Sequence, residues 1–145
     1  MATRTRTRRA LVFAVMPLVL VGGCTSKEPA GGAPVGVTLR DFHITTDRPT
    51  VPAGDVVFNV HNEAPITHEF VVVRTDLPAD DLPIGLDGLS VNEDWLTGVG
   101  EIDEVPDAQT DALLLNLAPG RYVFFCNLEG HYLGGMHGVL EVTAP

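Results

Sequence analysis

Short apolar segments with an alternating pattern recur along the chain and constrain its fold more than any other feature. In the segment DVVFNVHN (55–62), for example, Val56, Phe58 and Val60 alternate with the residues between them. A period of two is typical of a strand with one face in a core and the other in water. Segments of the same kind, rich in β-branched and aromatic residues, lie at 35–45, 68–75, 111–117, 121–127 and 138–143.

The residues between these segments favour tight turns. PAG precedes Asp55 and APG precedes Arg121, and in each the proline fixes φ while the glycine accepts a positive φ. The sequence contains no internal repeat and no long helical pattern. We therefore predict an all-β fold, a Greek-key β-sandwich of about seven strands.

One stretch does not fit the strand pattern. Residues 76–106 hold nine acidic side chains and no basic ones, together with prolines and glycines. A connection this long is usually functional or contains a short element of its own, and Ser90 with Glu93 three residues later is a helix-capping pattern. We expect one or two helical turns near 93–97, but for the segment as a whole we favour a long, solvated acidic crossover between the two sheets.

The first two dozen residues have the pattern of an export signal. Four arginines precede an apolar run, 10–21, and the small-residue junction VGGC (21–24). The run is too short for a stable transmembrane helix. The junction resembles a bacterial lipobox, which implies cleavage before Cys24 and attachment of lipid to its thiol; an ordinary secretory signal is the alternative. TRRALV (7–12) also resembles a twin-arginine export signal, although weakly.

These assignments divide the chain into a lipoprotein signal peptide (1–23), a flexible tether (24–34) and one folded domain (35–145). The leader holds four of the nine basic residues and none of the nineteen acidic ones, so the chain from Cys24 onward has a net charge of 14 negative. Such a body repels the phosphates of nucleic acid. With Cys24 lipidated, Cys126 is left as a single cysteine, which excludes an internal disulfide.

Cys126, His131 and Met136 occur at equal spacings in CNLEGHYLGGM (126–136). Each residue alone has an ordinary explanation, since cysteine and methionine pack well in cores and histidine is common in surface loops. Together, a thiolate, an imidazole and a thioether suit copper or zinc much better than calcium or magnesium. One cysteine and two histidines in a plane with a weak axial methionine form the blue-copper arrangement, and one loop can bring three of these four ligands together.

The second histidine has to come from elsewhere in the chain. We predict His68, which lies at the start of a strand just after a proline-containing loop, so that its side chain can lean from the end of the sheet towards the Cys126 loop. His43 and His61 lie within alternating strands and are expected to face solvent. His137 follows Met136 directly and is expected to point away from the site.

The body (roughly 35–144) resembles a cupredoxin, the family of plastocyanin, azurin and rusticyanin. CNLEGHYLGGM is similar to the C-terminal ligand loop of that family, and THEF (67–70) is similar to its upstream ligand histidine. The resemblance implies type 1 copper, cycling between Cu(I) and Cu(II), bound by His68, Cys126, His131 and Met136.

The function expected from these residues is one-electron transfer at a copper centre outside the cytoplasmic membrane. The expected protein is a monomer in the bacterial cell envelope, anchored to the outer face of the membrane by lipid on Cys24, with a redox partner such as a cytochrome or a terminal oxidase. His131 is the expected electron exit, with Leu133 in a small docking surface. The alternative is a copper-binding or copper-delivery protein with no physiological role in electron transfer.

An enzyme is not expected. Multicopper oxidases and copper nitrite reductases need histidines beside the cysteine, where this chain has Phe125 and Asn127, and a binuclear copper site needs a second cysteine in the loop. Two residues near the first ligand remain open. Asn62 either stiffens the ligand loop through its amide or is a plain turn residue, and Glu69 either points to solvent or stabilises oxidised copper and lowers its reduction potential.

Overall fold

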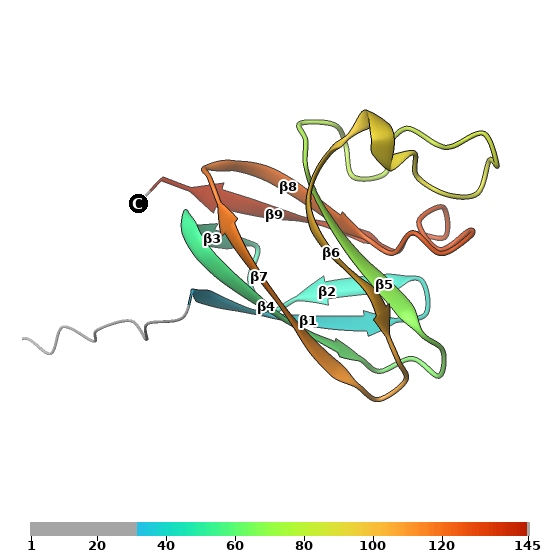
Figure 1. The fold of residues 1–145 in the computed structure, drawn as a ribbon, viewed down its shortest axis with the longest axis horizontal. Helices are drawn as coiled ribbons and strands as arrows, with labels where there is room; N and C mark the ends of the chain where they lie inside the picture. Colours follow the sequence, from blue (N-terminus) through green and yellow to red (C-terminus); the bar gives the residue numbers. More distant parts are fainter. Residues whose placement is uncertain (1–31, 145) are drawn as a thin grey trace, which may run out of the picture.

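The computed structural model describes residues 32–144 and shows a β-sandwich with nine strands and one short 3₁₀ helix (Figure 1). The all-β prediction is therefore confirmed. The elements are β1 (Ala33–Arg40), β2 (His43–Thr46), β3 (Thr50–Pro52), β4 (Gly54–Asn62), β5 (His68–Arg74), η1 (Glu93–Trp95), β6 (Thr97–Val105), β7 (Thr110–Leu117), β8 (Gly120–Phe125) and β9 (His137–Thr143).

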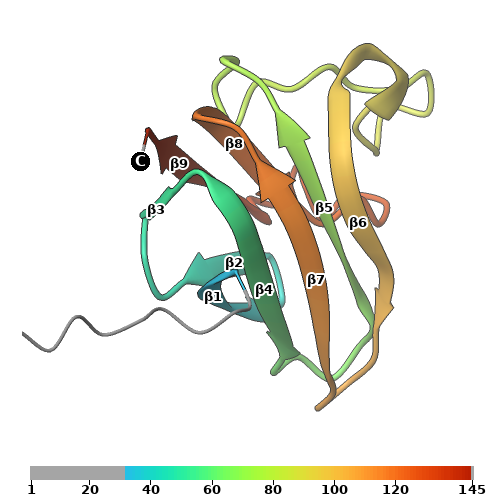
Figure 2. The ribbon, with the colours of Figure 1, turned by 60° about the vertical axis from the view of Figure 1, so that its left-hand side comes forward.

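The strands form two mixed sheets that face each other (Figures 1 and 2). One has the order β2-β1-β4-β7 and the other the order β3-β9-β8-β5-β6. Most neighbours are antiparallel, but β1 pairs with β4 and β3 pairs with β9 in parallel. Because β5 and β8 are adjacent and antiparallel, the start of β5 and the end of β8 lie at the same end of the second sheet.

Three details differ from the prediction. The expected strand at 35–45 is two strands, since the chain turns at Asp41 and Phe42, and Phe42 has a left-handed backbone with φ of 59°. β3 and β6 lie outside all the predicted segments. β1 begins at Ala33, two residues before the expected start of the domain at Val35.

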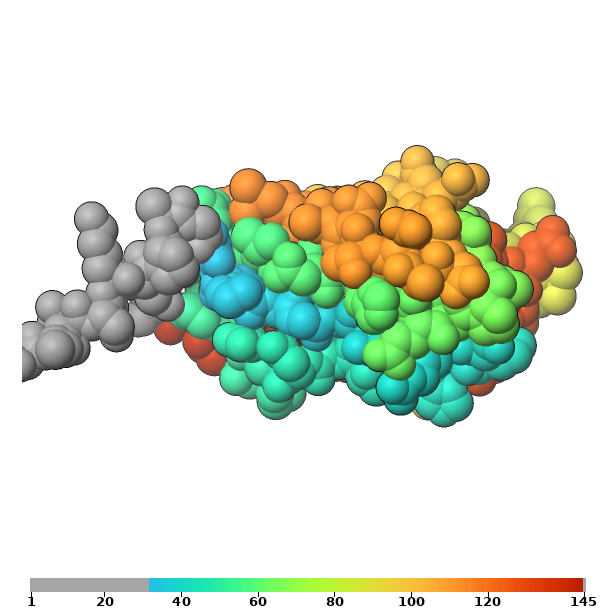
Figure 3. Space-filling model, turned by 90° about the horizontal axis from the view of Figure 1, so that it is seen from below, coloured from blue at the N-terminus to red at the C-terminus, as the bar shows by residue number. Residues whose placement is uncertain are grey.

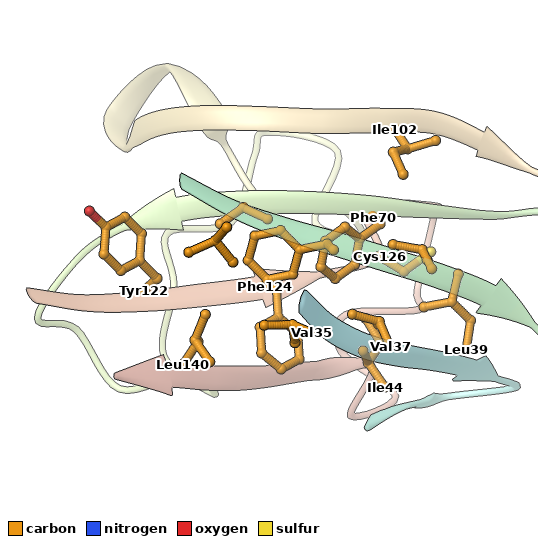
Figure 4. Packing of buried hydrophobic residues seen from close by; sticks show 14 of the residues in the cluster. Val35, Val37, Leu39, Ile44, Phe70, Ile102, Tyr122, Phe124, Cys126 and Leu140 are labelled. Atoms are coloured by element: carbon orange, nitrogen blue, oxygen red, sulfur yellow. The ribbon is translucent and has the colours of Figure 1, made fainter. Parts of the chain in front are cut away.

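The main core lies between the two sheets. Tyr122, Phe124 and Cys126 point into it from one face of β8 and the residue that follows, and Phe70 packs beside them (Figure 4). The opposite face of the second sheet carries a smaller cluster that includes Phe125 and Tyr132 and is covered by the segment before η1. Cys126 thus lies at the end of a packed row of side chains, where the core meets the loop ahead of β9.

The outer surface of the first sheet is made by β2, β1, β4 and β7, which lie side by side in the space-filling view (Figure 3). At one end of the molecule the β8–β9 loop, the β1–β2 turn and the segment between β5 and β6 come together (Figures 1 and 3). Within residues 32–144, no helix is long and apolar enough to cross a membrane. The expected signal peptide and the lipidated Cys24 lie outside the described residues.

Candidate metal centre

Cys126 is the first residue after β8 and is fully buried. Its backbone N–H donates to the carbonyl of Met136 at 3.1 Å, which closes the base of the loop that joins β8 to β9. Its sulfur accepts a hydrogen bond from the backbone N–H of Glu69, with an N–Sγ distance of 3.4 Å. Burial raises the pKa of the Cys126 thiol, so a metal ion that binds here displaces a proton.

His68 is the first residue of β5 and is also fully buried. The loop that leads to it is held by the buried side chain of Asn62, whose amide donates to the carbonyls of Ile66 at 2.7 Å and Val105 at 2.8 Å and accepts from the N–H of Ala64 at 2.8 Å. Asn62 therefore stiffens the approach to the first ligand, which settles one of the alternatives that the sequence left open.

His131 lies at the tip of the β8–β9 loop and is partly exposed. The loop folds back through hydrogen bonds from the N–H of His131 to the carbonyl of Leu128 and from the N–H of Met136 to the carbonyl of His131, with lengths of 2.9 and 3.0 Å. Gly135 makes this return possible because its φ of 103° is accessible to glycine and strained for other residues. Met136 is fully buried in the same core cluster as Cys126.

His68, Cys126 and His131 bring their donor atoms to one point. The sulfur of Cys126 lies 3.7 Å from Nδ1 of His68 and 3.5 Å from Nδ1 of His131, and all three donor atoms are within 4.8 Å of one another. Bonds of about 2.0–2.3 Å from a central ion to nitrogen and sulfur would place donors in a trigonal plane about 3.5–4.0 Å apart. The sulfur–nitrogen distances therefore fit a metal ion between the three residues.

The electrostatics also suit a metal. Burial lowers the pKa of His68, and the neighbouring His131 lowers it further. The imidazole of His68 is therefore neutral at pH 7 and keeps a lone pair available for a metal. Since imidazole and thiolate are the donors of copper and zinc sites, the chemistry of the donor set agrees with the geometry.

The other histidines lie outside this group, as expected. His43 is exposed, and its Nδ1 lies 3.0 Å from the carbonyl of Asp41. His61 lies on β4, with Nδ1 2.9 Å from the hydroxyl of Thr110. His137 packs its ring against Tyr132, with ring centroids 5.2 Å apart.

The acidic segment between β5 and β6, residues 75–96, is attached to the ligand loop rather than being a free crossover. Leu82 donates its N–H to the hydroxyl of Tyr132 at 2.8 Å, and Gly130 donates its N–H to the carbonyl of Leu89 at 3.0 Å. Asn127, the residue after Cys126, receives a hydrogen bond from Val91 at 2.7 Å. We call residues 75–96 the strap because they run across the ligand loop and are tied to it at these points.

Two expectations about this segment need correction. The helical element is one 3₁₀ turn at Glu93–Trp95, within the expected one or two turns near 93–97, but its N-cap is Asn92 rather than Ser90. The hydroxyl of Ser90 instead donates to the carboxylate of Asp87 at 2.7 Å, because Ser90 belongs to a turn in which this carboxylate also accepts from the N–H groups of Leu89 and Ser90. The expected crossover between the two sheets is also wrong, because the segment joins β5 to β6, which are neighbours in the same sheet, and it ends where β6 begins at Thr97.

Glu69 points into an acidic hollow beside the site rather than into open solvent. Its side chain is half-buried, and the same hollow is lined by Glu93, Glu101, Asp103 and Asn127. Burial raises the pKa of Glu69, and the negative charge of Glu93 raises it further.

Apolar side chains surround the exposed edge of His131. The ring of Phe42 packs against the imidazole with centroids 5.3 Å apart, and about half of its surface is exposed. Leu133, on the same loop, is 53% exposed, and Ile66 in the loop before His68 is 47% exposed. Gly134 allows Phe42 to lie here, because a Cβ at this position would meet the phenyl ring at 2.2 Å.

The β1–β2 turn is the part of the site that the sequence did not reveal. Asp41 places Oδ1 at 3.5 Å from Nε2 of the buried His68, and Phe42 covers His131. A turn residue such as aspartate gives no indication of a neighbour 27 positions later, so only the left-handed φ of Phe42, a feature of the folded chain, marks this turn as unusual.

Several solved structures are similar to this fold. The chain is similar to reduced auracyanin from the photosynthetic bacterium Roseiflexus castenholzii (22% identity, TM-score 0.59, 78% of this chain and 98% of that one). It is similar to rusticyanin from Thiobacillus ferrooxidans (18% identity, TM-score 0.55, 78% and 79%). It is also similar to auracyanin A, described as a "blue" copper protein from Chloroflexus aurantiacus (20% identity, TM-score 0.52, 77% and 100%).

No protein-family model matches the sequence, and no curated protein matches it. At these identities the structural likeness defines the fold, which is that of the cupredoxins. The resemblance in the ligand-loop sequence and the likeness of the whole sandwich therefore agree.

Proposed function

We propose that this protein is a type 1 copper protein that transfers single electrons. The observation that carries the proposal is the convergence of Nδ1 of His68, Nδ1 of His131 and the sulfur of Cys126 on one point at the end of a cupredoxin sandwich. Met136, buried and hydrogen-bonded through its carbonyl to Cys126, is the proposed axial ligand. Copper bound here would supply a one-electron Cu(II)/Cu(I) couple.

The protein's own residues favour rapid electron transfer without chemistry on a substrate. His68, Cys126 and Met136 are fully buried, so water has little access to the donor atoms. The ligands come from the rigid ends of two paired strands and from a loop closed by backbone hydrogen bonds, which limits movement between oxidation states. His131 is the ligand at the surface, and the apolar residues around it form a contact area for a partner.

A catalytic role is not part of the proposal. The two neighbours of Cys126 are both engaged in the fold: Phe125 is buried in the smaller core cluster, and Asn127 is hydrogen-bonded to Val91 and Glu93. Neither position offers a histidine that would connect this centre to a second copper ion.

The proposed location is the outer face of the cell membrane, and it depends on the leader rather than on the folded domain. We propose that the chain is exported, cut before Cys24 and anchored through lipid on that thiol, with a monomeric domain held on the tether. Cys24→Ser should then release the protein from membranes. An unmodified mature chain of the wild type, identified by intact mass and by partitioning into the aqueous phase of a detergent extraction, would exclude the anchor.

The proposed partner is a redox protein such as a cytochrome or a terminal oxidase, and copper delivery is the competing function. The two are separated by mixing the reduced holo-protein with an oxidised cytochrome in a stopped-flow instrument and, in parallel, with a copper-free acceptor protein. Electron transfer without loss of copper supports the proposal. Copper transfer with no electron exchange with any cytochrome or oxidase supports delivery.

A further inference from the structure

One ring nitrogen of His68, on the side away from the converging donors, has no ordinary partner within residues 32–144. Nε2 of His68 is buried and makes no hydrogen bond to residues 32–144. The nearest charged atom is Oδ1 of Asp41, at 3.5 Å, while the other nitrogen of the same ring faces the sulfur of Cys126. A buried imidazole N–H without an acceptor is destabilising. The carboxylate of Asp41 is the charged group placed to accept from it.

Asp41 is held in this position by the structure around it. The carbonyl of Leu39 accepts from the N–H of Glu63 at 2.9 Å, and Nε of Arg40 donates to the Glu63 carboxylate at 2.8 Å, so the end of β1 is fixed to the loop that leads to His68. Phe42 adopts a left-handed φ of 59°, a conformation that is unfavourable for a residue with a side chain. This strained turn places one residue against each ligand histidine.

The charge of Asp41 is not neutralised by a neighbouring base. Arg40, the adjacent cation, is paired with Glu63 instead. In the part of the chain that the structure describes, the basic side chain paired with the Asp41 carboxylate is the neutral imidazole of His68, at 3.5 Å. The side chain of Asp41 is 52% exposed whereas His68 is fully buried, so the carboxylate closes the solvent side of the ligand.

We propose that Asp41 is a positioning residue for His68: its carboxylate accepts a hydrogen bond from Nε2–H, which leaves Nδ1 free for the metal, and its negative charge favours Cu(II) over Cu(I). The inference rests on the proposed copper function. A carboxylate that accepts a hydrogen bond from the far N–H of a ligand histidine fixes the ring and raises the basicity of the nitrogen that binds the metal. A more basic imidazole with a negative charge beside it stabilises Cu(II) more than Cu(I), so Asp41 lowers the reduction potential of the copper.

The test separates the two effects with two substitutions and one control. Asp41→Asn keeps a hydrogen-bond acceptor but removes the charge, and Asp41→Ala removes both. Asp47→Asn is the control because it changes the net charge by the same amount just after β2, at the opposite end of the β1–β2 hairpin, where Asp47 pairs with Arg48.

Reduction potentials of the copper-loaded proteins measure the charge effect. Loss of such a carboxylate typically weakens metal binding 10–100-fold. Because Asp41 is half exposed and its charge is screened by solvent, we expect the lower end of this range. The affinity for Cu(II) relative to Cu(I) should fall about tenfold in Asp41→Asn, which raises the reduction potential by about 59 mV for one electron. Asp47→Asn should leave the potential near that of the wild type. A potential of Asp41→Asn that matches the control would overturn the charge effect.

Nitrogen-15 NMR of the copper-free proteins measures the positioning effect and does not depend on copper. We expect His68 to carry its proton on Nε2 in the wild type, the control and Asp41→Asn, and to lose this preference in Asp41→Ala. An unchanged tautomer in Asp41→Ala would overturn the positioning role. If the wild type forms no coloured copper complex, the proposed function fails. The NMR spectra, together with the zinc affinities of the same variants, then still decide whether Asp41 orients His68.

Discussion

Removal of the Asn127 side chain should loosen the strap from the ligand loop. The amide accepts from the N–H of Val91 at 2.7 Å and donates to the carbonyl of Val91 at 3.2 Å and to the carboxylate of Glu93 at 2.6 Å. Val91 is 4% exposed, so water has poor access to its backbone groups and cannot easily replace these hydrogen bonds. In Asn127→Ala these groups are left without their partners.

The size of the effect follows from these contacts. Two neutral hydrogen bonds contribute about 1 kcal/mol each, and a bond to a partly exposed carboxylate adds a similar amount, which gives a loss of about 3 kcal/mol in the free energy of unfolding. For a domain of this size that corresponds to a decrease in Tm of about 12 °C. Asn116→Ala is a matched control, because that side chain makes one exposed hydrogen bond, to Asp55 at 2.7 Å, and should cost less than about 1 kcal/mol.

Thermal melts of the copper-free proteins and amide hydrogen exchange are the assays. If the strap opens locally before the whole domain unfolds, exchange detects it, since the N–H groups of Leu82 and Gly130 form the other two ties. We expect both amides to exchange faster in Asn127→Ala and at the wild-type rate in Asn116→Ala. A variant at Asn127 with the Tm of the control and unchanged exchange at both amides would refute the account of the strap.

Further predictions concern the centre and its surroundings. Met136→Leu should leave a coloured copper site with a higher reduction potential, since a weak axial thioether stabilises Cu(II) and an alkyl group does not; complete loss of copper would make Met136 a main ligand instead. Leu133→Asp should slow electron transfer to a cytochrome at every ionic strength in stopped-flow experiments. Asp103→Asn should only flatten the salt dependence of the rate, because attraction between the acidic domain and a basic partner is screened as the Debye length shortens from about 10 Å at 0.1 M salt to about 3 Å at 1 M. Equal effects of the two variants at high salt would contradict this. The copper-free protein should lose stability as the pH falls through 6.5, because burial lowers the pKa of both His68 and His137 and the unfolded chain therefore takes up protons first. Melts that show no decrease in Tm as the pH falls would contradict this.

The strands that the sequence predicts correctly are those whose pattern reflects burial. β4 alternates because one of its faces lies in the core, and β5 reads as a continuous apolar run because both of its faces are covered. β6 was missed because its sequence, TGVGEIDEV, has two buried side chains, Ile102 and Val105, and gains its strand conformation from pairing with β5. β3 has three residues, too few for any pattern.

The same distinction applies to the site: residues with a local sequence pattern could be predicted, and residues placed only by folding could not. Cys126 and His131 could be predicted because metal chemistry restricts the residue types and a single loop fixes their spacing. His68 followed from its place at a strand start, which strand pairing brings opposite the end of β8. Asp41 could not be predicted, since its role depends on the packing of the β1–β2 turn against a distant ligand and not on any local pattern. The ties from the strap depend in the same way on the folded positions of Asn127 and Tyr132.

The most direct test of the central claim is the absorption spectrum of the purified domain after addition of Cu(II). A thiolate bound to Cu(II) in a trigonal site produces intense charge-transfer absorption, so the wild type should be blue, Cys126→Ser should be colourless, and His61→Ala should match the wild type because His61 lies on β4, outside the group of converging donors. A blue Cys126→Ser protein, or a wild type that binds zinc but forms no coloured complex with copper, would contradict the assignment of the site.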